Sequence, residues 1–475
     1  MFLDTLFGKK VDNATLTKDK MAELLSTNPE VLDKFENAYK KALTDTENNS
    51  DYVNAKTVNS NKAHENNSDE QKTIIDTIVS ELVNDTTVYR YVRQDNISES
   101  TELVKNTKYI SPNQLAVFDK DNRPLLTGNC MTVEIPDNYK MLVTNLYDMQ
   151  KAIDRGDYLK AHHLYGVFRQ GLDILDLDPI MYKMLDCNVS SMGYWLSAMV
   201  KAIDKYKFFK IPNTTIAKVP LPILQLTRLD YTAVNRNTLD IVDNWAQKVF
   251  DLDTNKHYFI KTGLFSSKFD FRNAKITDPK EVLDIGEYLL FIHFQSVSMA
   301  HFDLSGNNRP IMYGAATTNE WVVREFIEDE DDEKFTIYNG LPLHTEYRVF
   351  VDFDSDEVLG IHSYWDPKTM KNRFGHSKDS NDPTMIHDYI TYTAQEPKLM
   401  ERYNKNKDLI MAKVREFLPD VELTGQWSID IMQNGDKFWF IDMATAETSA
   451  FYDECVPANK RIPYKENWLP KLENS

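Results

Sequence analysis

The chain of 475 residues has little cysteine. Its three cysteines, Cys130, Cys187 and Cys455, lie far apart and never form a Cys-x-x-Cys pair, which argues against a disulfide framework or a cysteine zinc site. The sequence also lacks the run of about 18 apolar residues that spans a bilayer. The apolar N-terminal stretch is short and carries Asp4, unlike a signal peptide. We therefore expect a cytoplasmic protein with no membrane partner.

Basic residues are also scarce, because 55 lysines and arginines face 73 acidic residues and the net charge is −18. Phosphate backbones require basic patches, so general nucleic-acid binding is not expected, although a local basic site is compatible with this charge. No Ser-His-Asp or reactive-cysteine motif is evident.

A hydrophobic content of 42% and this length predict a globular protein of two or three domains. Residues 1–43 have helical apolar spacing, and residues 44–71 form a polar stretch that predicts a flexible linker. Residues 72–210 predict a mainly helical accessory domain with short strands. Residues 211–475 alternate strands and helices, which predicts an α+β domain.

Local patterns refine this division. Helical spacing runs from Thr73 to about Val92 and again through 145–205, with short strands in 102–135, including 114–118 and 131–135. His162 and His163 are neighbours on such a helix and point about 100° apart, so they are ordinary helix positions and not a metal site. After residue 211 we expect helices near 236–250, 279–291 and 398–417, and strands at 257–261, 310–314, 320–327, 346–353 and 357–364.

The segment Gly425–Asp442 predicts a hairpin around Asn434-Gly435, with Asp430 in one strand and Asp442 in the other. Aspartate is rare in strands and costly to bury, so two of them suggest a compensating charge, such as a hydrated divalent cation. Alternatively, Asp430 ends its strand and Asp442 caps the next segment of the chain. The residues leave both readings open.

The strand register decides between them. A two-residue loop, Asn434-Gly435, would place Asp442 opposite Trp427 and on the other face from Asp430. A three-residue loop, 434–436, would pair Asp442 with Ser428, and the two carboxylates would then share a face. A shared metal therefore requires an odd loop or a bulge.

Lys261 ends an apolar strand and precedes a small, hydroxyl-rich loop that contains Ser266 and Ser267. Such a loop can offer hydrogen-bond donors to phosphates while the lysine supplies a point charge. The alternative is a surface lysine before a turn. Arg348 is the lone cation of an apolar strand, and needs either an anionic ligand or a structural ion pair with Glu346 or a nearby acid.

The strand in Asn319–Ile327 runs into an acidic stretch. Its backbone could present N–H and C=O groups to an adenine edge, and either Glu328 or Asp329 could accept from ribose hydroxyls.

Together, in this order, these motifs resemble the ATP-grasp superfamily. The resemblance is closest to the cell-division-cycle-type family that chaperones assembly of a translation initiation factor, and to related phage-type proteins. It covers about residues 255–455. It implies an ATP-grasp domain, two α+β subdomains sandwiching ATP, after a mainly helical N-terminal region.

The same resemblance implies the site residues. Lys261 and Arg348 would be catalytic and Asp430 and Asp442 would bind Mg²⁺. The residues that would bind ATP are Lys261, Ser266, Ser267, Arg324, Glu325, Phe326, Ile327, Glu328 and Arg348. The family's last metal ligand is normally an asparagine, where this chain has Ala444, with Glu447 as a conceivable replacement.

The leading hypothesis is an ATP- and Mg²⁺-dependent ligase that forms an acyl phosphate on a carboxylate for attack by an amine or similar nucleophile. The alternative is an ATP-binding assembly chaperone or interaction factor with little turnover, which Ala444 favours. A weaker third hypothesis is an interaction protein with a degenerate nucleotide site. The carboxylate or protein substrate is unknown, and residues 72–210 are the candidate region for recognising it.

Overall fold

The structure is a computed structural model. It describes residues 69–92, 107–110, 188–227, 234–299, 318–331, 334–376 and 385–462, and single positions between 148 and 185. The segment 1–43, most of the linker 44–71, His162 and the strands expected at 114–118, 131–135 and 310–314 lie outside these ranges. Thr73–Tyr231 and Arg236–Ser475 form one compact unit, and the features described below lie within it, apart from the first residues of one helix, 69–72.

The unit is mixed α+β and contains a six-stranded sheet in the order β2-β1-β4-β7-β5-β6. The strands are β1 (Thr87–Tyr91), β2 (Thr107–Ile110), β4 (Thr214–Lys218), β5 (Tyr258–Thr262), β6 (Lys275–Ile276) and β7 (Glu320–Glu325). Strands β1 and β2 pair in parallel, and the other pairs of this sheet are antiparallel. Because β1 and β2 join β4, the boundary expected between residues 210 and 211 falls inside this unit.

The second sheet has five strands in the order β11-β10-β12-β13-β3. They are β3 (Phe209–Lys210), β10 (Thr345–Asp352), β11 (Glu357–Ser363), β12 (Gln426–Asn434) and β13 (Lys437–Thr445). Strands β8 (Thr336–Ile337) and β9 (Leu341–Pro342) form a separate small hairpin. Strands β10 and β12 mix apolar and polar residues, and both faces of each strand are largely buried.

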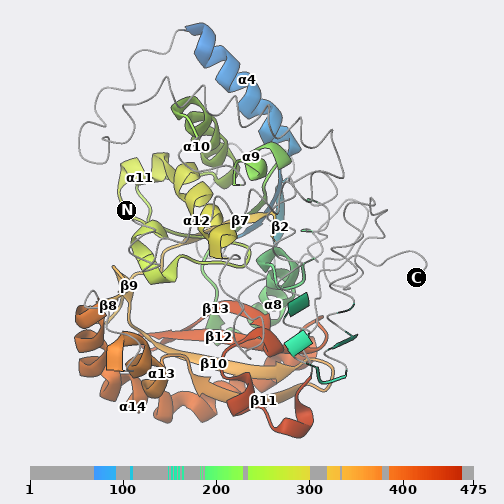
Figure 1. Cartoon of the computed structure of the whole chain (residues 1–475), viewed down its shortest axis with the longest axis vertical. Coiled ribbons are helices and arrows are strands. Elements are labelled where there is room, and N and C mark those ends of the chain that lie inside the picture. Colours follow the sequence, from blue (N-terminus) through green and yellow to red (C-terminus); the bar gives the residue numbers. More distant parts are fainter. Residues whose placement is uncertain are drawn as a thin grey trace. The chain divides into compact units, whose positions relative to one another are not determined.

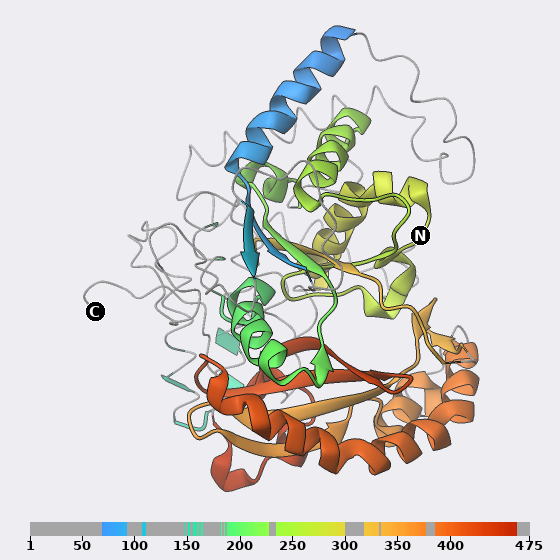
Figure 2. The same ribbon diagram turned by 180° about the vertical axis from the view of Figure 1, so that it is seen from behind.

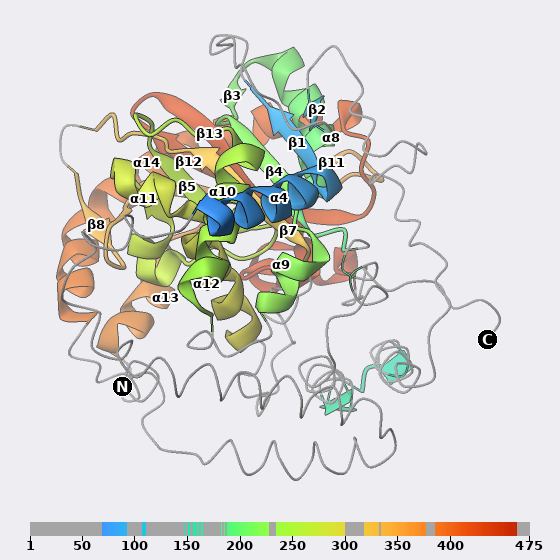
Figure 3. The ribbon, with the colours of Figure 1, turned by 90° about the horizontal axis from the view of Figure 1, so that it is seen from above.

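Helices cover the outer faces of both sheets (Figures 1 and 2). On the five-stranded sheet, α14 (Ile386–Phe417) packs Ile410 and Val414 against Val349 and Ile429 in one core with α8 (Met192–Tyr206). On the six-stranded sheet, α10 (Arg236–Phe250) packs on β4, α12 (Ile285–Met299) packs on β5, and the two helices contact each other (Figure 3). The remaining helices are α4 (Asp69–Asp85), α9 (Leu221–Leu226), α11 (Pro279–Leu283), α13 (Pro367–Lys371) and α15 (Tyr452–Cys455). Within the described ranges, no helix is both long and apolar enough to cross a membrane.

Several element boundaries differ from the sequence expectations. The helix expected from Thr73 to Val92 ends at Asp85, and Thr87–Tyr91 forms β1, because this β-branched and aromatic run favours a strand. Helix α4 also begins at Asp69, inside the expected linker. Helix α14 starts at Ile386, well before the expected residue 398, and continues through Pro397.

The β12–β13 hairpin has a register that neither expected loop produces. Asn434 pairs with Lys437, so the turn is Gly435-Asp436, and Gly435 takes a φ of +58° that glycine adopts without strain. Asn434 stays out of the turn because its buried amide receives the Glu330 N–H and donates to the Glu328 carbonyl. The prediction of an Asn434-Gly435 turn was therefore wrong by one residue.

A β-bulge follows in β13. Ile431 pairs with Phe440 but Asp430 pairs with Asp442, so Ile441 is the extra residue. Without this bulge, Ile441 would lie opposite Asp430 and Asp442 would point to the other face. The bulge thus places the two aspartates directly opposite one another on one face of the sheet.

Candidate functional site

A pocket lies between the inner faces of the two sheets and contains about 920 Å³ of space between atoms, part of it open to solvent. Its apolar and aromatic lining consists of Pro212, Phe259, Phe271, Phe326, Ile327, Leu341, Pro342, Tyr364, Trp365, Met432 and Ile441. Its polar lining consists of Lys261, Ser266, Lys268, Arg324, Glu325, His344, Glu346, Asp430 and Asp442. The pocket therefore combines an apolar slot with a strongly charged floor.

Lys261 and Asp442 join the two sheets at this floor. Lys261 of β5 is 1% exposed, and its Nζ donates to Asp442 Oδ2 of β13 at 2.7 Å. Lys261 shares a face with Phe259 and Arg324, because Lys261 pairs with Val322 and Phe259 pairs with Arg324 in the ladder. The lysine is thus not a surface residue, and its ammonium group is held by a carboxylate that faces the pocket.

Arg348 and Asp430 form the second ion pair. They are direct cross-strand partners in β10 and β12, and Nε and Nη2 of Arg348 donate to the two carboxylate oxygens at 2.8 and 2.7 Å. Burial lowers the pKa of Arg348, but the charge of Asp430 and its hydrogen bonds outweigh burial and raise that pKa. The guanidinium also lies over the ring of Tyr364. The ion-pair partner of Arg348 is thus Asp430 and not Glu346. Arg348 itself does not line the pocket, whereas Asp430 does.

Arg324 of β7 is a further buried cation. Its Nε donates to Thr214 Oγ1 at 3.1 Å, and Nη1 donates to the carbonyl of the bulge residue Ile441. Burial lowers its pKa to about 10, while the nearby charge of Asp442 opposes that shift. Its Nη2 has no hydrogen-bond partner among the described residues, although Arg324 lines the pocket. A buried donor without an acceptor is costly, so an anionic ligand here would stabilise the native state.

Glu346 adds a protonated acid to the floor. Burial raises its pKa to about 8, and the neighbouring charge of Asp430 raises it further, whereas Lys268 acts in the opposite direction. Trp365 Nε1 donates to Glu346 Oε1 at 3.2 Å. At neutral pH the floor therefore carries less negative charge than its count of acids suggests.

Some of the remaining residues expected at the site line the pocket, and others do not. Ser266, Glu325, Phe326 and Ile327 line the pocket, as do the two aspartates. Ser267 is buried nearby but is not part of the lining. The exposed Glu328 side chain contacts His257 Nδ1 at 2.5 Å and is also outside the lining.

Backbone donors at two expected positions are already engaged. The N–H groups of Glu325 and Phe326 donate to the carbonyls of Asn213 and His257. The N–H groups of Leu264 and Phe265 donate to Thr262 Oγ1. A base edge would thus have to bind Ile327 or later residues. A phosphate would have to bind Ser266 or the lysines.

Several lining residues carried no signal in the sequence. Lys268 lies just beyond Ser266 and Ser267 but had no expected role, and its Nζ lies over the ring of Tyr364. His344, Trp365 and Met432 come from separate elements, so only the folded chain brings them together. The Glu346-Tyr-Arg motif could have drawn attention to Glu346 itself.

Two carboxylates on one face fit a divalent cation, since Mg²⁺ is commonly bound through one or two carboxylates plus substrate phosphates. Both oxygens of Asp430 accept from Arg348, while Asp442 is 37% exposed at its side chain and turns one oxygen to Lys261. Ala444 pairs with Ser428 on the same face and provides no ligand. Of the three ligand positions that the resemblance implies, two therefore carry a carboxylate on this face and the third does not.

Comparisons with known proteins find matches among solved structures. No family model matches the chain, and no curated protein does. Among solved structures, a C-terminally truncated Cdc123 from Schizosaccharomyces pombe is 15% identical with a TM-score of 0.30, covering 61% of this chain and 97% of that chain. Cdc123 from the same organism is 15% identical with a TM-score of 0.27, covering 57% and 87%. The function of the pocket is therefore argued from its own geometry.

Proposed function

We propose that the pocket binds ATP together with Mg²⁺, in an ATP-grasp arrangement between the two sheets. The observation that carries this proposal is the row Arg348–Asp430–Asp442 across three strands, with Lys261 of the opposite sheet on Asp442. Two carboxylates line one end of a partly enclosed pocket, and each is bonded to a cation. That set matches a metal-bound polyphosphate better than an apolar ligand.

The lining supports a nucleoside at the other end. Phe259, Phe326, Ile327 and Met432 supply flat apolar surface, against which a base can pack. The charged floor and this slot share one cavity. A ligand with a planar apolar part and a polyanionic part, such as ATP, satisfies both.

Each residue then has a role in binding. Lys261 and Arg324 would face the phosphates, and Arg348 would orient Asp430 and reach the terminal phosphate once the metal takes the carboxylate. Asp430 and Asp442 would hold Mg²⁺, which would neutralise the phosphate charge. The pocket walls would exclude water from this end.

We propose further that the bound nucleotide stabilises a surface for a protein partner, with little turnover. Ala444 favours this reading, because the face with Asp430 and Asp442 lacks the third ligand implied by the resemblance. Residues 72–210 remain the candidate partner-binding region. The second candidate is the acyl-phosphate ligase, for which the cations on the floor would stabilise the charge of phosphoryl transfer.

A thermal-shift titration of the full chain tests nucleotide binding. A ligand that binds only the native state adds about 2.7 kcal/mol at a hundredfold excess over Kd, so MgATP should raise Tm. Lys261→Met should remove most of this shift, whereas Lys256→Met, an exposed lysine just before β5, should keep it. No shift in the wild type at millimolar MgATP would contradict the proposal.

Turnover separates the two candidates. ADP release that depends on an added carboxylate or peptide acceptor supports the ligase, whereas tight MgATP binding with negligible ADP release supports the assembly factor. Ala444→Asn should tighten Mg²⁺ binding if the site lacks only this ligand.

A further inference from the structure

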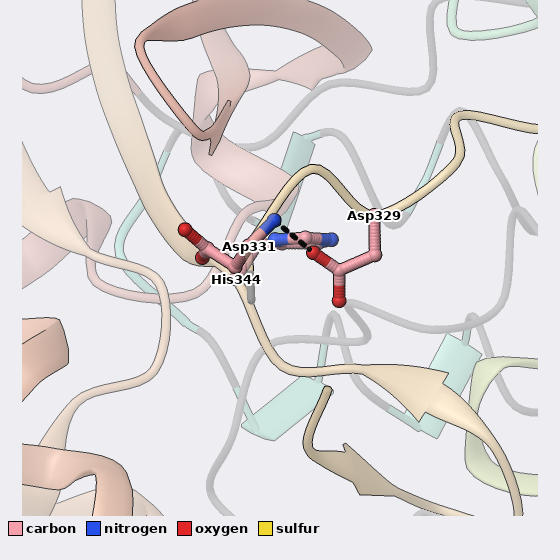
Figure 4. A group of neighbouring side chains, drawn as sticks. All are labelled: Asp329, Asp331 and His344. Atoms are coloured by element: carbon pink, nitrogen blue, oxygen red, sulfur yellow. Dashed lines mark hydrogen bonds between the residues drawn. The ribbon is translucent and has the colours of Figure 1, made fainter. Parts of the chain in front are cut away.

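A second polar cluster lies at the edge of the pocket, away from the paired aspartates. It consists of Asp329 and Asp331, on the segment after β7, and His344, just before β10 (Figure 4). One ligand atom of each residue lies within 4.8 Å of the other two. The cluster thus brings two carboxylates and an imidazole together from two chain segments.

His344 provides an independent sign of a ligand. Its side chain is 3% exposed, and neither ring nitrogen has a hydrogen-bond partner among the residues that the structure describes. Burying a polar ring without a partner costs free energy, so such a histidine needs an explanation. One of its ring nitrogens lies within 4.8 Å of a carboxylate oxygen of each acid, and Figure 4 shows the ring beside both.

The protonation state of the ring suits a metal ligand. Burial lowers the pKa of His344, although the charges of Asp329 and Asp331 act against that shift. A neutral imidazole has a free lone pair for a cation. Neither ring nitrogen of His344 is engaged by a described residue, so that lone pair is not used by another donor.

From this geometry we infer a binding site for Zn²⁺, formed by His344, Asp329 and Asp331. Histidine nitrogen and carboxylate oxygen are zinc ligands, whereas Mg²⁺ prefers oxygen alone. At bond lengths of about 2.0–2.1 Å, tetrahedral ligand atoms lie roughly 3.3 Å apart, so small side-chain rotations would close the set. Three protein ligands leave one position for water.

Arg402 supports the position of Asp331. Its Nη1 and Nη2 donate to the two carboxylate oxygens at 2.7 Å each. Metal-binding carboxylates are commonly hydrogen-bonded by a further residue that fixes their orientation. Each oxygen keeps a second lone pair, so Asp331 can bind the cation and retain Arg402.

The site would tie the segment after β7 to the start of β10. Asp329 Oδ1 also accepts the Asp331 N–H at 2.9 Å, which holds the two acids in one turn. Zn²⁺ would hold this turn and the His344 side of the pocket at a fixed spacing. This inference does not require that the pocket bind a nucleotide.

Equilibrium dialysis of the metal-stripped full chain against Zn²⁺, in excess Mg²⁺ to occupy oxygen-only sites, tests the assignment. We expect one bound Zn²⁺ per chain, and at least about tenfold weaker binding in His344→Gln and Asp329→Asn. Asp329→Asn keeps the oxygen that accepts the Asp331 N–H, so it preserves the local turn. The matched control is His387→Gln, since His387 is 81% exposed and lies 3.7 Å from an acid, and it should bind zinc as the wild type does.

Co²⁺ in place of Zn²⁺ supplies a second readout, an absorption band that His344→Gln abolishes. Three outcomes overturn the inference: no zinc bound by the wild type, equal zinc binding by both variants and the control, or a loss of MgATP binding in His344→Gln with zinc binding unchanged. The last outcome would assign His344 to the nucleotide. Loss of zinc binding with MgATP binding intact would support the zinc site and leave the proposed function standing.

Discussion

Lys261 of the six-stranded sheet and Asp442 of the five-stranded sheet form a 2.7 Å ion pair across the pocket floor. Arg348 holds Asp430 in the same way within the five-stranded sheet. Lys261 and Arg348, two of the groups that would contact phosphate, are therefore each bonded to a carboxylate that would contact the metal. Phosphate alone competes with the carboxylates for the two cations, and metal alone competes with the cations for the two carboxylates. When both bind, the phosphate takes the place of the carboxylates and the metal takes the place of the cations.

This pairing predicts strong synergy between metal and nucleotide. ATP without metal meets two cations whose charge Asp442 and Asp430 already offset, and Mg²⁺ alone meets two carboxylates whose charge Lys261 and Arg348 already offset. We expect calorimetry to show weak binding of ATP in EDTA and of Mg²⁺ alone, and binding at least about tenfold tighter when both are present, equivalent to about 1.4 kcal/mol. Equal affinity for ATP with and without Mg²⁺ would refute this coupling.

A second prediction concerns the fork of Arg324. Arg324→Lys cannot reach Thr214 and the Ile441 carbonyl at once, because a lysine carries one donor group on a flexible chain. We expect the free energy of unfolding of the variant to be about 1–3 kcal/mol lower, so that it unfolds at a lower denaturant concentration. We also expect it to bind MgATP more weakly. Arg272→Lys, which alters an exposed arginine paired with Asp270, should change neither quantity.

The third prediction concerns pH. Asp243 of α10 is buried, and burial raises its pKa to about 8. The Glu287 N–H and the charge of Arg236 oppose this shift, whereas the charges of Asp284 and Glu287 add to it. Between about pH 4 and pH 8 the folded chain therefore holds a proton that the unfolded chain has released. Stability should fall as pH rises through this window, and each pKa unit is worth about 1.4 kcal/mol.

Asp243→Asn should flatten that dependence, because the amide keeps an oxygen for the Glu287 N–H and does not ionise. Chemical denaturation at several pH values measures the slope. Asp240→Asn, on the same helix, removes a carboxylate that pairs with Arg236 and is the control. An unchanged slope in Asp243→Asn would show that other groups produce the dependence.

A fourth prediction concerns the contact between α10 and α12. A Cβ on Gly286 would lie 2.6 Å from the Val242 carbonyl oxygen, which is backbone and cannot rotate away. Gly286→Ala should therefore separate the two helices and destabilise the fold by about 1–3 kcal/mol. Urea denaturation measures this, and a midpoint equal to that of the wild type would mean that the crossing readily widens.

The sequence predicted much of the α+β pattern after residue 211, because its strands and helices have clear apolar periodicity. Helix α10 ends where the spacing placed it, and β10 and β11 lie within a residue of their expected positions. The error at Thr87–Tyr91 arose where a helical spacing continued into β-branched and aromatic residues. Pairing with β4 then decided the conformation, and no local pattern contains that information.

The site was harder to predict than the fold. Two aspartates in a hairpin signalled a special face, but the register depended on a bulge whose carbonyl is held by Arg324 from the other sheet. The turn moved by one residue because Asn434 binds the segment 328–330. His344 and Trp365 reach the pocket only through tertiary packing, which spacing along the chain does not encode.

Because of the bulge at Ile441, the acidic pair Asp430–Asp442 is either fully formed or absent. Side chains of a strand point to one face or the other, with no position between, so Asp442 faces Asp430 completely or not at all. A slip of β13 by one residue would remove one carboxylate from the floor, leave Lys261 without its partner, and still keep most of the ladder. Variants of this hairpin should therefore divide into two classes, those that retain the whole site and those that remain folded without it.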